Sequence, residues 1–314
     1  QRFSQARPMT ASLLPAWPSL LPSTEVGSIR ALLAELAQAQ WRERDRSQGG
    51  LSSGPAGVAL FLGHLSRVEG FERWREPARE LLEAAVAGLG NLGTTDLYAG
   101  FTGVAWAMEH LQAEGLVDLG GDPNQEVDEV LLEHLAGARW DRAYDLVSGL
   151  VGYGVYGLAR AHRPSGRALL GRVLDHLEES AVRTGEGLAW PSEEREWSGG
   201  SEASAMVARW NLGVAHGQPG VLGLLAAMAE LGIGGGRTLA LYDSGRAWLQ
   251  ARVQPRPWSG LPAWLPRGEQ SGAPRNTRVA WCYGDLGAAV VLLGAARRLR
   301  RPEEEVLALD LADR

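Results

Sequence analysis

This sequence of 314 residues has a single cysteine, Cys282, and no excess of basic residues. One cysteine excludes an intramolecular disulfide and is typical of a reducing compartment, so we expect a cytoplasmic protein. The formal net charge of −6 gives no reason to expect a nucleic-acid partner. No signal peptide is recognisable, because the apolar stretch 9–22 contains three prolines and lacks a basic region followed by an uninterrupted helix.

A long apolar run that could span a membrane is also missing. The stretch 211–229 carries no formal charge, but His216, Gly217 and Pro219 interrupt it, which predicts a buried core helix entered through a loop. We therefore expect no transmembrane segment. With 45% apolar residues the chain can bury a large core, and we expect one domain over 24–314 after an N-terminal extension over 1–23.

What the sequence does contain is a pair of glycines, three residues apart, that recurs along the chain. The pairs are Gly54/Gly57, Gly100/Gly103, Gly149/Gly152, Gly217/Gly220 and Gly284/Gly287. Each opens an apolar segment rich in Ala and Leu, which predicts buried helices over 58–65, 104–111, 153–159, 221–231 and 288–296. Amphipathic stretches predict outer helices over 29–41, 78–89, 127–135, 169–181 and 239–253, and a further one over 306–311.

A buried helix followed by an amphipathic one, repeated along the chain, predicts an all-α fold that is either an open solenoid or a closed α/α toroid. The buried helices are apolar around most of their circumference, so both of their sides must be covered, which favours the toroid. The glycines are expected to allow close backbone contact and a positive φ at each helix entry. Alternatively, they only tighten the packing of the helices.

Two insertions interrupt the repeat, over 183–210 and 255–278, and both contain tryptophans. Long ordered loops on a rigid scaffold commonly shape a binding site. The insertions flank the segments that hold His216 and Cys282. We therefore expect the mouth of a substrate site at this place.

Each candidate site residue has a structural interpretation beside the functional one. Cys282, at the entry of a buried helix, is suited to a thiolate that binds metal or attacks a substrate, or it is a small buried hydrophobe. His216 is a base, a ligand or a structural group. Asp96 and Asp145 precede helices, where aspartate caps the N-terminus. Arg278 lies in a polar loop, where most arginines are merely solvated. Their placement at the same end of successive helices favours a shared site.

The segments NLGVAHGQPG (211–220), RVAWCYGDLG (278–287) and DLVSGLVG (145–152), with the repeated glycine pair, resemble the LanC lanthionine synthetase cyclases. The resemblance extends from Leu51 to the C-terminus. It implies an α/α toroid with a zinc ion in its central cavity, and an enzyme that closes thioether rings in dehydrated lanthipeptide precursors. The implied partners are such a precursor and a lanthipeptide dehydratase.

The resemblance also implies a role for individual residues. Cys282 matches the first zinc thiolate, His216 the acid/base histidine, and Asp145 the aspartate that assists it. Zinc lowers the pKa of a peptide thiol, so that a thiolate can add to the β-carbon of dehydroalanine or dehydrobutyrine. Protonation of the α-carbon then suits His216.

Two more residues receive a role in the same way. Arg278 and Tyr283 flank the zinc cysteine and match positions that handle the enolate, whose negative charge a cation or hydrogen-bond donor stabilises. Two tryptophans, Trp190 in the first insertion and Trp281 beside the cysteine, are expected to bind the substrate.

The zinc site is where this sequence departs from the family. The family completes it with an adjacent Cys-His pair on the next inner helix, whereas here Cys282 is the only cysteine and the sequence ends at Arg314. We therefore expect a toroid that is incomplete at the C-terminus and a zinc site with too few ligands. Three explanations are open: a piece of a longer cyclase, a natural variant that binds peptide without metal catalysis, or a site completed by another chain.

Two other functions also stay open. An α/α toroid suits a glycoside hydrolase, for which Asp96 and Asp145 would be the paired carboxylates. The other alternative is a non-catalytic scaffold that binds peptide. Shared Cys, His and metal in the cavity would identify the cyclase, two carboxylates the hydrolase, and a metal-free site that leaves peptide unchanged the scaffold.

Overall fold

The computed structural model describes residues 22–44, 50–137, 139–195, 206–267 and 273–314. They form two compact units, 1–127 and 128–314, and each is described by itself. Most of the N-terminal extension expected over 1–23 lies outside the described residues. The single domain expected over 24–314 stays a prediction.

The first unit is helical and is built around α2. Its elements are α1 (Val26–Arg42), α2 (Pro55–Leu65), η2 (Glu72–Trp74), α3 (Arg75–Ala87), η3 (Leu89–Asn91) and α4 (Phe101–Ala113), and α5 (Gln125–His134) begins at its end. α2 packs against both α3 and α4. Leu62, Leu82 and Leu111, one from each of these helices, are fully buried. The core of this unit therefore lies between α2, α3 and α4.

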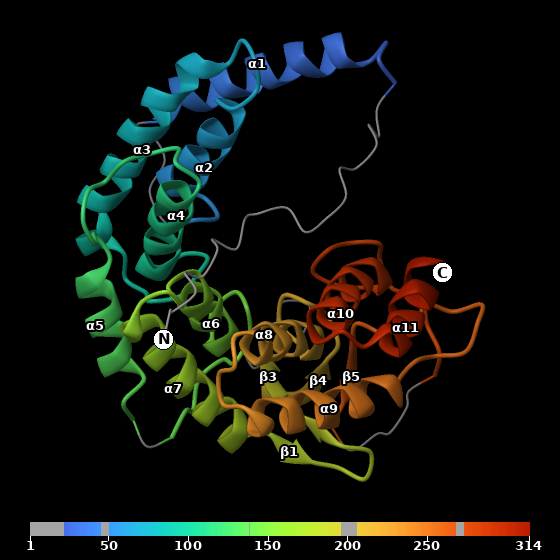
Figure 1. The fold of residues 1–314 in the computed structure, drawn as a ribbon. Helices are drawn as coiled ribbons and strands as arrows, with labels where there is room; N and C mark the ends of the chain where they lie inside the picture. Colours follow the sequence, from blue (N-terminus) through green and yellow to red (C-terminus); the bar gives the residue numbers. More distant parts are fainter. Residues whose placement is uncertain (1–21, 45–49, 138, 196–205, 268–272) are drawn as a thin grey trace, which may run out of the picture. The chain divides into compact units, whose positions relative to one another are not determined.

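The second unit alternates buried and outer helices and adds short strands. Its elements are α6 (Leu150–Ala159), α7 (Pro164–Ser180), β1 (Val182–Arg183), β2 (Leu188–Ala189), β3 (Pro191–Arg195), β4 (Met206–Asn211), α8 (Gln218–Glu230), α9 (Gly236–Gln250), β5 (Trp264–Pro266), α10 (Asp285–Leu299) and α11 (Pro302–Ala312). α8 packs against both α6 and α10 (Figure 1). The outer helices α7, α9 and α11 each pack against the buried helix that precedes them.

The burial of these helices follows their composition, as predicted. Nearly the whole length of α8 is buried, because its residues are apolar or small on every side. In α9 the buried residues recur at three- or four-residue spacing from Thr238 to Leu249, which leaves the other face wet. The predicted succession of buried and amphipathic helices is therefore confirmed in this unit.

Both insertions contain β-structure, which the sequence analysis did not predict. β1 pairs with β2, and a separate antiparallel sheet has the order β3-β4-β5. In this sheet Asn211, the last residue of β4, is the register partner of Trp264 in β5. The second insertion is thereby tied to the strand that leads into α8. Parts of both insertions, 196–205 and 268–272, lie outside the described residues.

The first glycine of each pair is the N-cap residue of a buried helix. Among the five N-cap glycines, Gly284 alone has a positive φ, 98°. The expectation of a positive φ is wrong at the other four, where the backbone is extended. The glycines instead permit close backbone contact. A Cβ would overlap the carbonyl oxygen six residues earlier at eight of the paired glycines, namely Gly57, Gly100, Gly103, Gly149, Gly217, Gly220, Gly284 and Gly287. Each entry loop therefore folds tightly over the first turn of its own helix.

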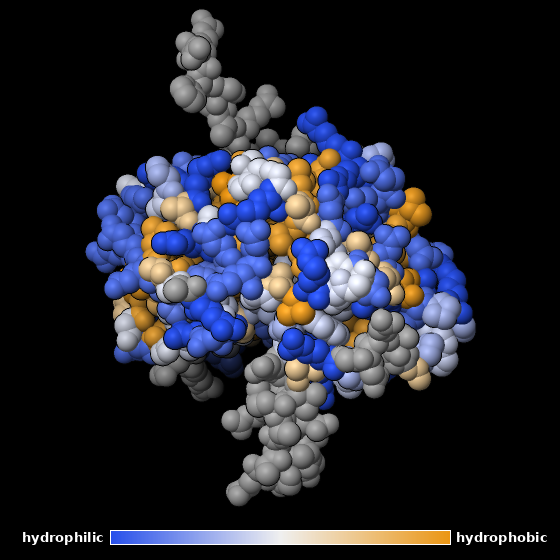
Figure 2. Space-filling view, turned by 90° about the horizontal axis from the view of Figure 1, so that it is seen from below, coloured by the Kyte–Doolittle hydropathy of each residue, from blue (hydrophilic) through white to orange (hydrophobic). Residues whose placement is uncertain are grey.

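Hydrophilic residues cover most of the face drawn in Figure 2, with small apolar patches between them. Val279, Trp281, Leu286 and Val290 are exposed large apolar residues near the start of α10. In the part of the chain that the structure covers, no helix is both long and apolar enough to cross a membrane.

Candidate active site

The candidate site lies in the second unit, where backbone hydrogen bonds join the entry loops of successive buried helices. The Leu146 amide, before α6, donates to the carbonyl of Ala215, before α8, at 3.1 Å. The Ala215 amide in turn donates to the carbonyl of Cys282, before α10, at 3.4 Å. These links bring the three entry loops together at one end of α6, α8 and α10. Residues far apart in the sequence thus become neighbours.

Asp145 and His216 form a close pair across two of these loops. The distance between His216 Nδ1 and Asp145 Oδ2 is 2.6 Å. Because a carboxylate oxygen accepts, Nδ1 carries the proton, and in the neutral ring the lone pair lies on Nε2. The Asp145 side chain is 12% exposed and that of His216 is 37% exposed, so the histidine reaches solvent while its partner is shielded. The pair is oriented for proton transfer at Nε2.

The second oxygen of Asp145 holds its own loop. Oδ1 accepts the backbone N–H of Ser148 at 2.7 Å and the hydroxyl of Ser148 at 3.3 Å. Asp96, at the matching position in the first unit, does the same for its loop, since Oδ1 accepts the amides of Ala99 at 2.6 Å and Gly100 at 3.2 Å. Both aspartates therefore brace an entry turn, while glycine occupies the N-cap position. Asp145 also binds a histidine, whereas the partners of Asp96 among the described residues include none.

Tyr283 lies beside this pair, with its ring centroid 6.4 Å from that of His216. The Asn211 amide donates from Nδ2 to the Tyr283 hydroxyl at 2.9 Å, and Asn211 Oδ1 accepts the Gly213 amide at 3.0 Å. Asn211 is fully buried, which fixes the phenol by a rigid contact. The guanidinium carbon of Arg278 lies 5.4 Å from the centroid of the Tyr283 ring. The predicted residues His216, Asp145, Tyr283 and Arg278 are therefore brought together.

Cys282 is a free, half-buried cysteine in the same loop cluster. A catalytic zinc site takes three protein ligands. Among the residues that the structure describes, no group of three or more His, Cys, Asp or Glu side chains is placed to hold a metal ion. Nδ1 of His216 is already committed to Asp145. The residues of this site thus offer one thiolate and do not by themselves fit a zinc ion.

The two tryptophans expected to bind substrate differ in exposure. Trp281 is 52% exposed next to Cys282 and can contact a ligand. Trp190 is fully buried, and its indole N–H donates to the Leu177 carbonyl at 2.7 Å. The backbone oxygen of Trp190 also accepts the side-chain amide of Gln218 at 2.8 Å. Trp190 therefore packs at the start of α8 in this structure, without a surface for a substrate to reach.

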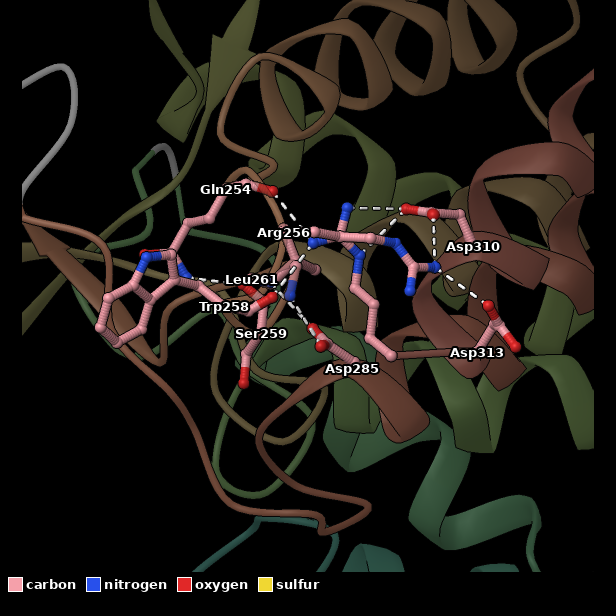
Figure 3. A network of polar contacts seen from close by, with 10 residues as sticks. Gln254, Arg256, Trp258, Ser259, Leu261, Asp285, Asp310 and Asp313 are labelled. Carbon is pink, nitrogen blue, oxygen red and sulfur yellow. Dashed lines mark hydrogen bonds and ion pairs between the residues drawn. The ribbon is translucent and has the colours of Figure 1, made fainter.

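The segment that carries Arg278 is held by residues at the start of the second insertion, Gln254 just before it and Ser259 within it. Gln254 bonds both backbone groups of Arg275, donating from Nε2 to its carbonyl at 2.9 Å and accepting its amide at 3.0 Å. The Thr277 amide donates to the Ser259 hydroxyl at 2.9 Å. Figure 3 shows Gln254 and Ser259 in one polar network with Asp285. Arg278 therefore extends from a segment whose backbone is fixed.

The network continues to α10 and α11. Asp285 at the start of α10 accepts the amides of Gly260 at 2.7 Å and Leu261 at 2.8 Å (Figure 3). Arg256 forms ion pairs with Asp310 at 3.0 Å and Asp313 at 3.1 Å. An acidic side chain in the first helical turn also suits the helix dipole. The second insertion is thus fastened to the helices on which the site is built.

A cavity of about 180 Å³ opens beside Tyr283. Its lining consists of Ala263, Trp264, Arg275, Asn276, Thr277, Arg278 and Tyr283. Two arginines and no carboxylate line it among the described residues. The site therefore combines a histidine–aspartate pair, a phenol and a small cavity lined by two arginines.

A comparison of the sequence with known protein families identifies the family of the chain. The sequence profile of a family described as lanthionine synthetase C-like protein matches residues 47–313. The chain belongs to this family. The resemblance drawn from the motifs is thereby confirmed.

The fold of this lanthionine synthetase C-like chain is similar to the solved structure of a nisin cyclase. The TM-score is 0.72 at 23% sequence identity, and the match covers 90% of this chain and 74% of that one. At this identity the likeness establishes the fold, and the predicted all-α, α/α-toroid class is confirmed. No curated protein matches the chain.

Three residues of this LanC-like site were missed by the sequence analysis. Asn211 stood inside a quoted motif, and an uncharged polar residue at the edge of an apolar stretch is a signal that could have identified it. Gln254 and Arg275 contact the site only through tertiary structure, and their positions, just before and within the second insertion, give no local signal.

Proposed function

We propose that this protein is a lanthipeptide cyclase, which adds a peptide cysteine to dehydroalanine or dehydrobutyrine and forms a (methyl)lanthionine ring. The observation that carries the proposal is the 2.6 Å pair of His216 and Asp145 beside Tyr283 and Cys282. Membership of the lanthionine synthetase C-like family and the likeness to a nisin cyclase support it.

The reaction needs a proton at the α-carbon of the acceptor. The thiolate attacks the β-carbon, a C–S bond forms, and the electron pair of the C=C bond moves into an enolate. His216, which has taken up the thiol proton at Nε2, gives this proton to the α-carbon and returns to its neutral form, which completes the ring. Asp145 stabilises the imidazolium and holds the ring in place through Nδ1–H.

The enolate oxygen needs a positive or hydrogen-bonding partner while it carries charge. Arg278 and Tyr283 are suited to this role because the Tyr283 ring lies beside His216 and the guanidinium of Arg278 lies over that ring. Asn211 is a positioning residue, since its buried amide fixes the Tyr283 hydroxyl. Preorganised donors of this kind lower the barrier because they do not reorganise during the reaction.

Zinc, when bound, would lower the pKa of the peptide thiol and so make a thiolate available at neutral pH. Within this proposal Cys282 is one ligand, and the remaining ligands come from outside the residues of the site described above. The protonation and enolate steps use residues of this chain alone.

The substitution His216→Ala tests the proposal. Ring closure is expected to slow by about 100-fold or more or to give misdirected rings, because a general acid contributes roughly 10²–10⁴-fold. Affinity for the dehydrated peptide should change less than about threefold, since the histidine acts on the enolate. Mass spectrometry after thiol alkylation counts unclosed cysteines, and calorimetry gives the affinity. A large loss of affinity with an unchanged closure rate would rule out the acid/base role.

A non-catalytic peptide-binding scaffold is the second candidate, and the single thiolate of the site favours it. Two measurements distinguish the cyclase from the scaffold: the zinc content of the protein, and the number of alkylatable thiols left on a dehydrated peptide. A cyclase leaves no alkylatable thiol on the peptide and loses this activity when a chelator removes zinc. The scaffold binds the same peptide with its thiols still alkylatable.

A further inference from the structure

The cavity beside Tyr283 is too small to hold a whole ligand of ordinary drug or cofactor size. Its volume is about 180 Å³, whereas small-molecule pockets measure about 300–1,000 Å³. It therefore suits one group of a larger molecule that extends beyond it. Since Arg278 and Tyr283 form part of its wall, that molecule would also contact the proposed catalytic residues.

The charge of the cavity is positive. Arg275 and Arg278 line it, and neither guanidinium pairs with a carboxylate of the residues that are described. The guanidinium of Arg275 is instead held over the ring of Trp264, 5.1 Å from its centroid. A planar guanidinium stacked on an indole keeps its edge available for a bidentate partner.

The position of Arg275 is fixed by the fold. Gln254 bonds both its amide and its carbonyl, and Trp264 is held in β5 by pairing with Asn211 of β4. Asn276 is held as well, because its Oδ1 accepts the Ser259 amide at 3.1 Å. A cationic group with a braced backbone loses little freedom when it binds an anion.

We propose that this cavity is a subsite for a carboxylate of the peptide substrate, bound by Arg275. The inference rests on the proposed cyclase function, because it takes the ligand to be a peptide. Arginine pairs with carboxylates through two parallel hydrogen bonds, and among peptide groups only acidic side chains and the C-terminus offer one. The preferred substrate therefore carries an acidic residue, or its own C-terminus, close to the ring that is being closed.

Ligand-detected NMR titration with three short peptides tests the subsite on the intact chain. The probes are Ac-Ala-Glu-Ala-NH₂, Ac-Ala-Gln-Ala-NH₂ and Ac-Ala-Ala-Ala-OH, which distinguish a side-chain carboxylate from a C-terminal one. At least one carboxylate peptide should bind about fivefold more tightly than the glutamine peptide, as a charge-assisted pair requires. In Arg275→Gln this preference should fall to less than about twofold.

Arg172→Gln is the matched control, because Arg172 is an exposed arginine on α7 and its loss changes the net charge equally. This variant should keep the preference. Equal loss in both variants would mean a bulk charge effect and overturn the subsite, and so would a preference that survives in Arg275→Gln. Displacement by inorganic phosphate without any preference among the peptides would also overturn it, in favour of a phosphate site.

The peptides contain neither cysteine nor dehydroamino acid, so the outcome is separate from catalysis. If the wild-type protein closes rings but shows no preference for a carboxylate peptide, only the subsite proposal is removed. A carboxylate preference in a protein that never closes rings removes the cyclase proposal and leaves an anion-binding cavity.

Discussion

At the scale of single residues, Asp145 performs two tasks with its two oxygens. Oδ2 holds Nδ1 of His216, while Oδ1 holds the amide of Ser148 in its own loop. A carboxylate can accept at both oxygens, whereas an amide can accept at only one. The geometry of the entry loop and the orientation of the histidine are therefore coupled through one side chain.

This coupling predicts the effect of Asp145→Asn. If the amide oxygen stays on the Ser148 N–H, its NH₂ faces Nδ1 of His216, which must then accept, so the ring is held in the tautomer that carries its proton on Nε2. If the amide turns the other way, the contact with Ser148 is lost. Ring closure should fall on the order of 100-fold or more, because the imidazolium loses its stabilising charge and its orientation. Single-turnover cyclisation followed by mass spectrometry measures this rate.

Asp96→Asn is the control for that prediction. Asp96 braces the corresponding loop through Ala99 and Gly100, and its partners include no histidine among the described residues. Ring closure should stay within about twofold of the wild type. A comparable loss in both variants would contradict the histidine–aspartate assignment, because loss of the loop contacts alone would then account for the effect.

Motifs predicted which residues lie together, but not the contacts that place them. His216, Asp145, Arg278 and Tyr283 follow from short segments next to paired glycines, because each segment opens a helix at the same end of the repeat. Asn211 orients Tyr283 from a strand, a contact 72 residues apart that no local pattern encodes. Trp190 was expected to bind the substrate because it lies in the first insertion. Its large apolar ring favours the core instead, where it is fully buried.

At the scale of elements, the entry loop and the first turn of each buried helix form a recurring unit. The glycines let the loop carbonyl approach the helix, and backbone bonds then join one loop to the next. The buried helices were predictable because a run of Ala and Leu has few other stable arrangements. The sheet β3-β4-β5 was not, since its short strands depend on pairing with each other rather than on local propensity.

Two glycine substitutions separate this close contact from helix propensity. Gly220→Ala should lower the free energy of unfolding by about 1–3 kcal/mol, because its Cβ would overlap the Val214 carbonyl oxygen. Gly294→Ala, in the interior of α10 with nothing within 4 Å of the added Cβ, should raise it by about 0.5–1 kcal/mol. Urea unfolding followed by circular dichroism measures both. Similar effects of the two changes would contradict the role of close contact.

At the scale of the whole molecule, two histidines tie stability to pH. Burial, and then the nearby His64, lowers the pKa of His110 below its ordinary value of 6.5. Burial, and then Arg142, lowers the pKa of His134 in the same direction. The rings of His64 and His110 are joined by a bond between their Nε2 atoms at 2.8 Å, which requires one of them to accept and hence to be neutral there.

The protein should therefore lose stability as the pH falls below about 6.5. Above that pH the two histidines are neutral in both the folded and the unfolded chain. Below it the unfolded chain binds protons more readily than the folded chain, because the folded-state pKa values are lower. Unfolding therefore becomes more favourable as the pH falls. Urea titrations between pH 7.5 and pH 5.5 should give a falling midpoint, and His110→Gln should flatten the slope. His162→Gln, at an exposed histidine, is the control and should leave the slope unchanged. A midpoint that rises on acidification, or an equal flattening by His162→Gln, would contradict the assignment to the half-buried His110 and His134.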